Sequence, residues 1–313
     1  IPEATAQKIY DEMIDFAKYA FNKSHAAAYA VVAYQTAWLK YYYPVEFMAA
    51  LMTSVIDNPG KVSEYILTCR QMGIGILPPD INEGAARFSV SNGSIRYALS
   101  AIKSIGRPVV DAISEERRLG GRFKSLSDFL ERMTGKEVNK RVVENLIKAG
   151  ALDSLGGTRQ QYILAYAGIM DSVAQSQKTM MTGQMSLFDL VDEDQKASFQ
   201  AKLPDVGEYP KELLLSFEKE VLGIYVSGHP LEEDEGRWRK NITAVTTDFQ
   251  LDEETNRTKV RDGQQVVVGG MITGKTVKYT KNNRVMAFLQ LEDLLGSVEV
   301  VVFPNIYEKN TQQ

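Results

Sequence analysis

The sequence is poor in the residues that build disulfides and metal centres. Its 313 residues contain one cysteine, Cys69, and two histidines, His25 and His229. A single cysteine excludes an internal disulfide and a paired-cysteine zinc site, and two histidines exclude a histidine-rich metal site. So little cysteine fits a reducing compartment, and we expect the cytoplasm.

The sequence also lacks a long hydrophobic run and a signal-peptide pattern. Its most apolar helical stretch, residues 26–42, is interrupted by Gln35, Thr36 and Lys40. We therefore expect no membrane partner. The chain opens at Ile1 inside a helical pattern and without an initiator methionine, so we expect a piece of a longer protein.

The sequence has little excess charge of either sign, because its net charge is only −4. The charged residues are, however, unevenly distributed along the chain. Residues 84–160 carry 14 Lys and Arg against 8 Asp and Glu, whereas residues 185–255 carry 7 against 17. These blocks indicate a basic surface for a polyanion, followed by an acidic connecting region that avoids it.

A cation, a hydroxyl, an imidazole and a phenol gather where a long helix is expected to begin. The four residues are Lys23, Ser24, His25 and Tyr29. We expect Ser24 to cap the helix, or Asn22 if the helix starts earlier. The free N–H groups and positive dipole of a helix start suit a phosphate-bearing ligand. The alternative is an ordinary capped helix with a surface lysine and a packed histidine.

Proline and glycine divide the first 80 residues into helices. We expect helices over residues 1–24, 26–42, 45–56 and 61–72, separated by Pro44 and closed by Gly73. An extended run, 74–77, ends at Pro78-Pro79, and a short hairpin is expected between Arg87 and Tyr97.

The segment 99–113 is similar to a helix-hairpin-helix, in which a tight turn aims backbone N–H groups at a DNA phosphate. Ser104 stands where such turns often carry their first glycine, which bears on the turn geometry. A second copy is expected around the helix 142–152 and the turn 155–159. The alternative is an ordinary turn between two packed helices, without phosphate contacts. The predicted DNA-binding residues are Lys103, Ser104, Ile105, Gly106, Arg107, Lys140, Arg141, Lys148 and Arg159.

Several stretches together resemble the α subunit of bacterial DNA polymerase III, the C-family of replicative DNA polymerases. The resemblance runs through residues 21–52, Leu77–Asn82, Lys103–Gly106 and Gly223–Pro230, and it covers nearly the whole chain. His229, within the last of these, is interpreted as structural, since nothing near it completes a nucleophilic triad.

A polar linker, 172–184, leads to Gln184-Met185-Ser186-Leu187-Phe188. A glutamine followed by an aliphatic and an aromatic residue is typical of a short peptide that orders on binding the sliding clamp. The alternative is that Leu187 and Phe188 pack this linker onto a nearby helix.

After residue 263 the period changes to that of strands, which we expect over 264–272, 276–278, 284–291 and 298–303. These resemble the first three strands of an OB-fold. Cations and one aromatic residue surround one hairpin, as in single-strand binders. They are Lys275, Lys278, Tyr279, Lys281 and Arg284.

The resemblance implies a multidomain, mainly α fold. It divides into helical fingers (1–82), a clamp-binding domain with tandem helix-hairpin-helix motifs (83–240) and a partial antiparallel OB-fold (241–313). It implies a DNA-directed DNA polymerase as the parent enzyme. Its partners are primer-template DNA, an incoming deoxynucleotide, the sliding clamp (β subunit), single-stranded template and other replisome subunits.

The catalytic palm, with the carboxylates that hold Mg²⁺, is expected before Ile1, so we assign no catalytic residue and no metal ligand to this chain. The chain alone is therefore expected to be inactive. The alternative function is a non-catalytic DNA-binding tether of a repair or recombination complex. A nuclease built on the acidic runs 192–194 or 232–235 ranks far lower, because adjacent carboxylates do not converge on one point.

Overall fold

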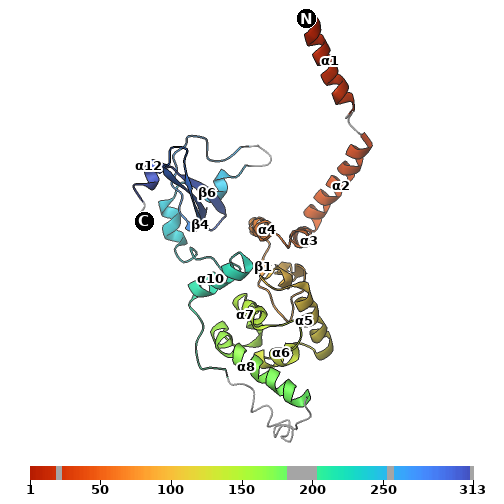
Figure 1. Cartoon of the computed structure of the whole chain (residues 1–313), viewed down its shortest axis with the longest axis vertical. Helices are drawn as coiled ribbons and strands as arrows, with labels where there is room; N and C mark the ends of the chain where they lie inside the picture. The colour runs from red at the N-terminus through yellow and green to blue at the C-terminus, as the bar shows by residue number, and fades with distance from the viewer. Residues whose placement is uncertain (19–22, 182–202, 252–256, 311–313) are drawn as a thin grey trace.

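The computed structural model describes residues 1–18, 23–181, 203–251 and 257–310. This part of the chain is mainly helical, with a small three-stranded sheet in its middle and an antiparallel one near its end (Figure 1). The predicted fold class, mainly α with a partial β region, is confirmed.

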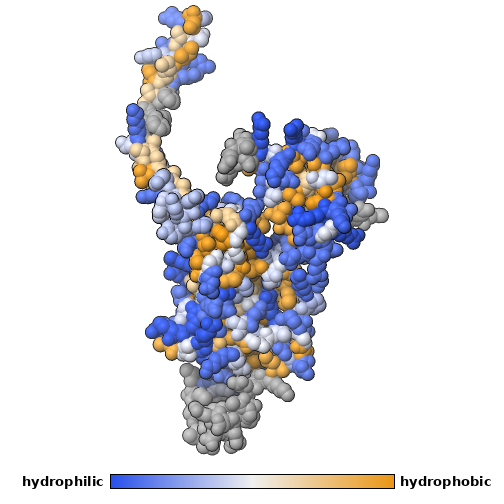
Figure 2. Space-filling model, turned by 180° about the vertical axis from the view of Figure 1, so that it is seen from behind, coloured by the Kyte–Doolittle hydropathy of each residue, from blue (hydrophilic) through white to orange (hydrophobic). Residues whose placement is uncertain are grey.

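The first two helices, α1 (Glu3–Lys18) and α2 (Lys23–Tyr42), form an arm that extends away from the rest of the described chain (Figure 1). None of the residues of α2 is buried. Large apolar side chains such as Tyr34 and Tyr41, 71% and 79% exposed, lie along it. Figure 2 shows apolar and polar side chains mixed along this arm. Among the described helices, none is both long enough and apolar enough to cross a membrane.

Two shorter helices join the arm to the core. In α3 (Pro44–Ser54) Pro44 takes the first turn, where its missing N–H costs nothing. In α4 (Pro59–Gln71) the Asn58 side chain accepts a hydrogen bond from the Lys61 N–H at 3.2 Å. The chain then leaves α4 through Gly73, whose φ of 73° suits a residue without Cβ.

The first sheet has the strand order β1-β3-β2, with β1 (Ile76–Leu77) parallel to β3 (Ser94–Arg96) and β2 (Ser89–Ser91) antiparallel to it. Asn92 and Gly93 both have positive φ, 49° and 75°, as a tight two-residue hairpin turn requires. The predicted hairpin is therefore present.

The remaining helices of the body surround one apolar core. They are η1 (Leu99–Ala101), α5 (Arg107–Gly120), α6 (Leu126–Met133), α7 (Lys140–Lys148), η2 (Asp153–Leu155), α8 (Arg159–Met181) and α10 (Lys211–Leu222). The core includes Met52 and Ile66 from the first helices, Ile81, and Leu146 and Leu222 from the later ones. It therefore runs without a break across the predicted domain boundary at residue 82, which stays a prediction.

The last described region contains α11 (Glu235–Asn241), η5 (Thr246–Phe249), the antiparallel sheet β4 (Met271–Tyr279), β5 (Val285–Glu292) and β6 (Ser297–Val302), and α12 (Pro304–Tyr307). Trp238 of α11 donates to the Gly269 carbonyl at 2.7 Å, and Asp293 accepts from the Thr246 hydroxyl at 2.7 Å. These bonds fix the helix and the sheet to each other. Figure 2 also shows apolar side chains over this sheet.

Two elements differ from the expectation. The strands predicted over 264–272 and 276–278 are one strand, β4, which begins only at Met271. Just before it, a Cβ at Gly270 would lie 2.5 Å from the Glu292 carbonyl oxygen, so this close approach requires a glycine. The helix predicted before the first hairpin turn is only the 3-10 turn η1. The predicted antiparallel strands are present, and their assignment to an OB-fold stays a prediction.

Candidate nucleic-acid interface

The first hairpin turn, residues 102–106, is fixed to the core by its apolar side chains. Ile102 and Ile105 are 2% and 3% exposed, whereas Lys103, Ser104 and Gly106 between and after them face solvent. Because Ile102 and Ile105 are buried in the core, the positions between and after them are left on the surface of the turn.

The backbone of the turn is held from two sides. The Lys103 N–H donates to the Val221 carbonyl of α10 at 2.8 Å, and the Lys103 carbonyl accepts from the Asn145 side chain of α7 at 2.7 Å. Both partners lie far along the chain, so the position of the turn is set by the packing of the body.

Ser104 adopts the left-handed conformation, with a φ of 65°. Among the described residues, no acceptor is within hydrogen-bond distance of the N–H groups of Ser104, Gly106 and Arg107. Gly106 precedes α5, so these donors lie at the positive end of the helix dipole. Unsatisfied N–H groups at a helix start suit a phosphate oxygen.

Cations surround these donors. Arg107 makes only a 3.8 Å contact with Asp111, and both side chains are largely exposed, so this pair holds Arg107 weakly. Arg141 lies one helical turn before Asn145 on the same face of α7, which brings it to the side of the turn that Asn145 holds. Lys103 is exposed as well.

Arg87 was not among the predicted DNA-binding residues. It lines one recess with Gly106 and Arg107, and the Ser100 Oγ in this recess is buried without a hydrogen-bond partner in the described part of the chain. The signal was present in the sequence, because alternation along the hairpin puts Arg87 opposite the buried Phe88.

The second hairpin is built differently. After α7 the Gly150 N–H donates to Ile147 and the Ala151 N–H to Leu146, which closes the helix on its own carbonyls. Before α8 the Gly157 N–H donates to the Tyr162 hydroxyl at 2.7 Å and the Thr158 N–H to Gln161 at 3.0 Å. The N–H groups of Gly150, Ala151, Gly157 and Thr158 are therefore already satisfied.

A carboxylate of the chain itself occupies the start of α8. Glu208 accepts hydrogen bonds from the N–H groups of Arg159 at 2.8 Å, Gln160 at 3.2 Å and Tyr209 at 2.8 Å. The Thr158 hydroxyl donates to the Gly207 carbonyl beside it at 3.2 Å. A phosphate would have to displace Glu208 to reach this helix end.

The structure does not support two of the predicted phosphate partners, Arg159 and Lys148, because both are held by carboxylates. Arg159 is 6% exposed and pairs with Asp153 at 2.9 Å and with Glu218 at 3.4 Å. Burial alone would lower the pKa of Arg159, but the two carboxylates outweigh it and raise that pKa. This arginine is therefore part of the core's ionic network.

The side chain of Lys148 is 16% exposed and pairs with Glu144 at 3.0 Å and Glu220 at 3.1 Å. Burial alone would lower the pKa of Lys148, and the two glutamates raise it above its usual value. Lys140 also has a partner, Asp171 at 2.8 Å, but both side chains face solvent, so Lys140 stays accessible.

The residues predicted to bind a nucleotide lie apart from the hairpins, on the arm (Figure 1). Lys23, Ser24, His25 and Tyr29 are all exposed, and the His25 and Tyr29 rings contact each other at a centroid distance of 4.4 Å. The described helix begins at Lys23, so Ser24 lies in its first turn and does not cap it; Asn22 lies outside the described residues.

The cations predicted on the sheet are only partly open. Arg284 is held by Glu308 at 2.9 Å and Asn305 at 2.8 Å, and the Lys278 ammonium lies 4.8 Å from the centre of the Phe288 ring. Lys275 similarly lies 5.2 Å from the Tyr307 ring centre. All five residues are exposed, Tyr279 by 71%.

The predicted clamp-binding residues, Gln184, Met185, Ser186, Leu187 and Phe188, lie outside the described residues.

Comparison with known proteins places the hairpins in a recognised motif. A helix-hairpin-helix motif model matches residues 73–162, which include both turns described above. Over nearly its whole length the chain is also similar to proteins named DNA polymerase III subunit alpha. It is 40% identical over 305 residues to that of Vibrio cholerae (97% of this chain, 26% of the relative). For Saccharopolyspora erythraea the identity is 41% (96% of this chain, 25% of the relative), and for Thermus aquaticus 39% (98% and 24%). The chain spans about a quarter of the length of these relatives.

Proposed function

We propose that this chain is the DNA-holding part of a bacterial replicative DNA polymerase of the DNA polymerase III subunit alpha kind. The first hairpin turn is the observation that carries the proposal. It offers three backbone N–H groups without an acceptor among the described residues, at the start of α5 and beside Lys103 and Arg107.

The similarity to the polymerase subunits supports the same assignment. It extends over 96–98% of this chain at about 40% identity, and the helix-hairpin-helix match lies inside it. Addition of deoxynucleotides to a primer is proposed for the longer protein, of which this chain corresponds to about a quarter.

The described residues give Mg²⁺ no set of ligands, because no three Asp, Glu, His or Cys side chains among them come close enough to hold a metal ion. We therefore derive no step of the phosphoryl transfer from this chain. In the proposed enzyme the Mg²⁺ ions are bound by other residues and supply the charge that stabilises the transferred phosphoryl group.

The geometry of the turn predicts what kind of DNA contact it makes. Backbone N–H groups and lysine or arginine side chains contact phosphate oxygens, which are the same at every base pair. The grip is therefore independent of sequence, and its strength falls steeply with salt because each contact releases counterions.

This grip is tested with the full 313-residue chain and a primed DNA duplex over a range of salt concentrations. Arg107→Ala removes one phosphate contact and should weaken binding on all sequences and lower the slope of log K against log[salt] by about 1. Arg118→Ala is the control, since Arg118 is exposed at the other end of α5 and pairs with Glu115. An unchanged slope for Arg107→Ala, or an equal change in both variants, would refute the role of the turn.

Three finer assignments belong to the same proposal. The exposed start of α2 binds the triphosphate of the incoming nucleotide or the templating base, the segment 184–188 docks on the sliding clamp, and Tyr279 with Lys281 contacts single-stranded template. The exposure of Lys23, Tyr279 and Lys281 supports the first and the third.

A further inference from the structure

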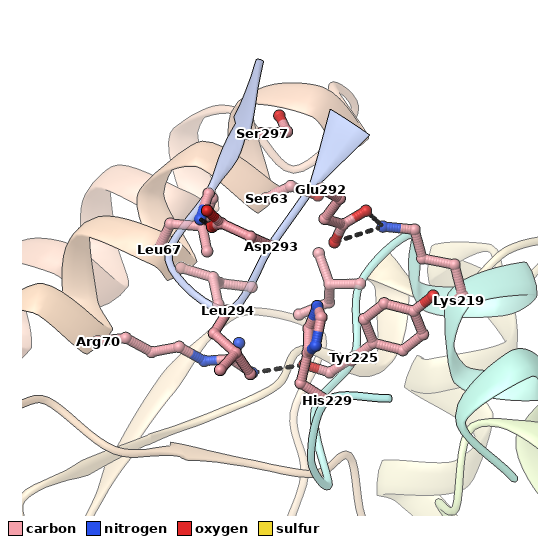
Figure 3. Close-up of a pocket in the computed structure, with 13 residues that line it drawn as sticks. Ser63, Leu67, Arg70, Lys219, Tyr225, His229, Glu292, Asp293, Leu294 and Ser297 are labelled. Atoms are coloured by element: carbon pink, nitrogen blue, oxygen red, sulfur yellow. Dashed lines mark hydrogen bonds and ion pairs between the residues drawn. The ribbon is translucent and has the colours of Figure 1, made fainter. Parts of the chain in front are cut away.

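A small cavity lies where three separate parts of the chain meet. Helix α4 forms one wall, the end of α10 and the segment after it form the second, and the turn between β5 and β6 forms the third. Its volume is about 100 Å³. Figure 3 shows Arg70 entering from α4 on one side and Lys219 from α10 on the other, with His229 and Tyr225 between them.

His229 contributes a buried donor to this cavity. The residue is 7% exposed, and its ring packs edge-on against Tyr225 at 5.3 Å. The His229 Nδ1 accepts a hydrogen bond from the Leu231 N–H at 3.1 Å, so in the neutral ring the proton is on Nε2. The Nε2 atom is buried and has no partner in the described part of the chain. A buried N–H without an acceptor is costly, which points to a group that completes it.

The carboxylates that line the cavity are already satisfied. Glu292 accepts from the Lys219 ammonium at 2.8 and 3.1 Å. Asp293 accepts from the Thr246 N–H and hydroxyl at 2.8 and 2.7 Å, and from the Leu295 and Gly296 N–H groups at 2.8 and 3.0 Å. Neither is a strong candidate to accept the proton of His229.

The groups that remain uncommitted are donors. Arg70 donates to the Tyr225 carbonyl but has no carboxylate within ion-pair distance among the described residues, so its charge is uncompensated by contact. Ser63 and Ser297 also line the cavity, and their hydroxyls make no hydrogen bond within the described ranges. The Arg70 guanidinium and the neutral His229 Nε2–H can only donate, and a hydroxyl can donate as well as accept, so these groups suit a ligand that only accepts.

We propose that this cavity binds a small oxyanion of phosphate size, held by His229 Nε2–H and the Arg70 guanidinium. At about 100 Å³ the cavity is well below the size of sites for drug-sized ligands, which start near 300 Å³. A nucleotide or a DNA backbone is therefore too large. The site is separate from the hairpin turn, and the proposal stands independently of DNA binding.

A bound oxyanion would join α4 to the segment after α10, because Arg70 belongs to the first and His229 to the second. It would lie beside the Lys219–Glu292 ion pair, which already links α10 to the end of β5.

The two histidines allow a direct test by NMR of the imidazole nitrogens in the full chain. Inorganic phosphate is titrated at constant ionic strength, with chloride as the compensating salt. We expect a saturable shift of the His229 Nε2–H signal and none for His25, which lies on the exposed arm. A shift that does not saturate, or that both histidines share, means an adventitious ion only and overturns the proposal.

Arg70→Met removes the cation and should weaken phosphate binding about tenfold or more, as expected for losing a charge-assisted hydrogen bond. Arg118→Met is the matched control and should bind as the unchanged chain does. Unchanged binding by Arg70→Met overturns the proposal, provided its amide spectrum shows the native fold. A parallel titration with acetate separates the sources: saturation with acetate and not with phosphate would show a carboxylate site and refute the phosphate assignment.

Discussion

At the scale of single residues, Ser104 carries a strain that a glycine would not. Its φ of 65° costs an L-residue about 1–2 kcal/mol, while glycine at this position would lose about 0.5–1 kcal/mol of extra chain entropy on folding. Ser104→Gly should therefore raise the free energy of unfolding by about 0.5–1 kcal/mol, measured by urea denaturation. Ser104→Ala keeps the strain and should bring no gain, so equal effects of the two variants would contradict this account.

His229 makes stability depend on pH, because burial lowers its pKa below the ordinary value. The charged and titratable groups that face it are Glu292, Arg70, Lys219 and Asp293. Between the lowered pKa and the ordinary value of about 6.5, the unfolded chain binds the proton that the folded chain refuses. Stability is then complete above about pH 6.5 and falls as the pH drops below it, by at most about 1.4 kcal/mol per pH unit.

The measurement is the free energy of unfolding between pH 5 and 8 for the natural chain and for His229→Gln. The difference between the two should shrink as the pH falls, because the variant lacks the titrating group. Parallel curves would show that His229 does not titrate on unfolding.

At the scale of the elements, the start of α8 depends on a residue that follows it by about 50 positions in the sequence. Glu208 caps two N–H groups there, those of Arg159 and Gln160, and a carboxylate at a helix start contributes about 0.3–2 kcal/mol. Glu208→Gln should lower the free energy of unfolding by about 1 kcal/mol. Glu131→Gln, at an exposed position of α6, is the control; a loss no larger for Glu208→Gln than for Glu131→Gln would refute the cap.

Local signals predicted the elements well. Pro44 begins α3, Gly73 follows the end of α4, and Asn92-Gly93 forms the tight turn, all as expected. Each of these residues acts through its own backbone angles. For the predicted DNA-binding site the short turn was informative, because Lys103, Ser104, Gly106 and Arg107 are exposed at a helix start, while their contact with DNA stays a prediction.

The other site assignments depended on contacts between residues that are distant in the sequence, which no local pattern shows. A charge count cannot show that Arg159 is buried against Glu218, or that Glu208 fills a helix start 49 residues before it. The sequence did single out Ser104 as standing in place of a turn glycine, but it could not show that serine adopts the left-handed conformation there, which serine rarely does. What decided these cases is the packing of α7, α8 and α10, which no local pattern contains.

At the scale of the whole molecule, the residues proposed to bind a nucleotide lie on the arm, apart from the hairpin residues proposed to bind DNA (Figure 1). In the complete enzyme, Lys23→Ala and His25→Ala should raise the KM for deoxynucleotides about tenfold or more, the cost of a lost charge-assisted contact, and leave DNA affinity unchanged. Lys8→Ala on α1 is the control for the loss of an exposed charge on the arm. Unchanged nucleotide kinetics would remove the start of α2 from the nucleotide site.

The two bonds that hold the Lys103 backbone have a mechanical consequence. The turn is tied through Val221 to α10 and through Asn145 to α7, so a force applied to it would pass directly into two packed helices. A phosphate held by this turn would therefore be held by the packed body and not by a loop that can move alone.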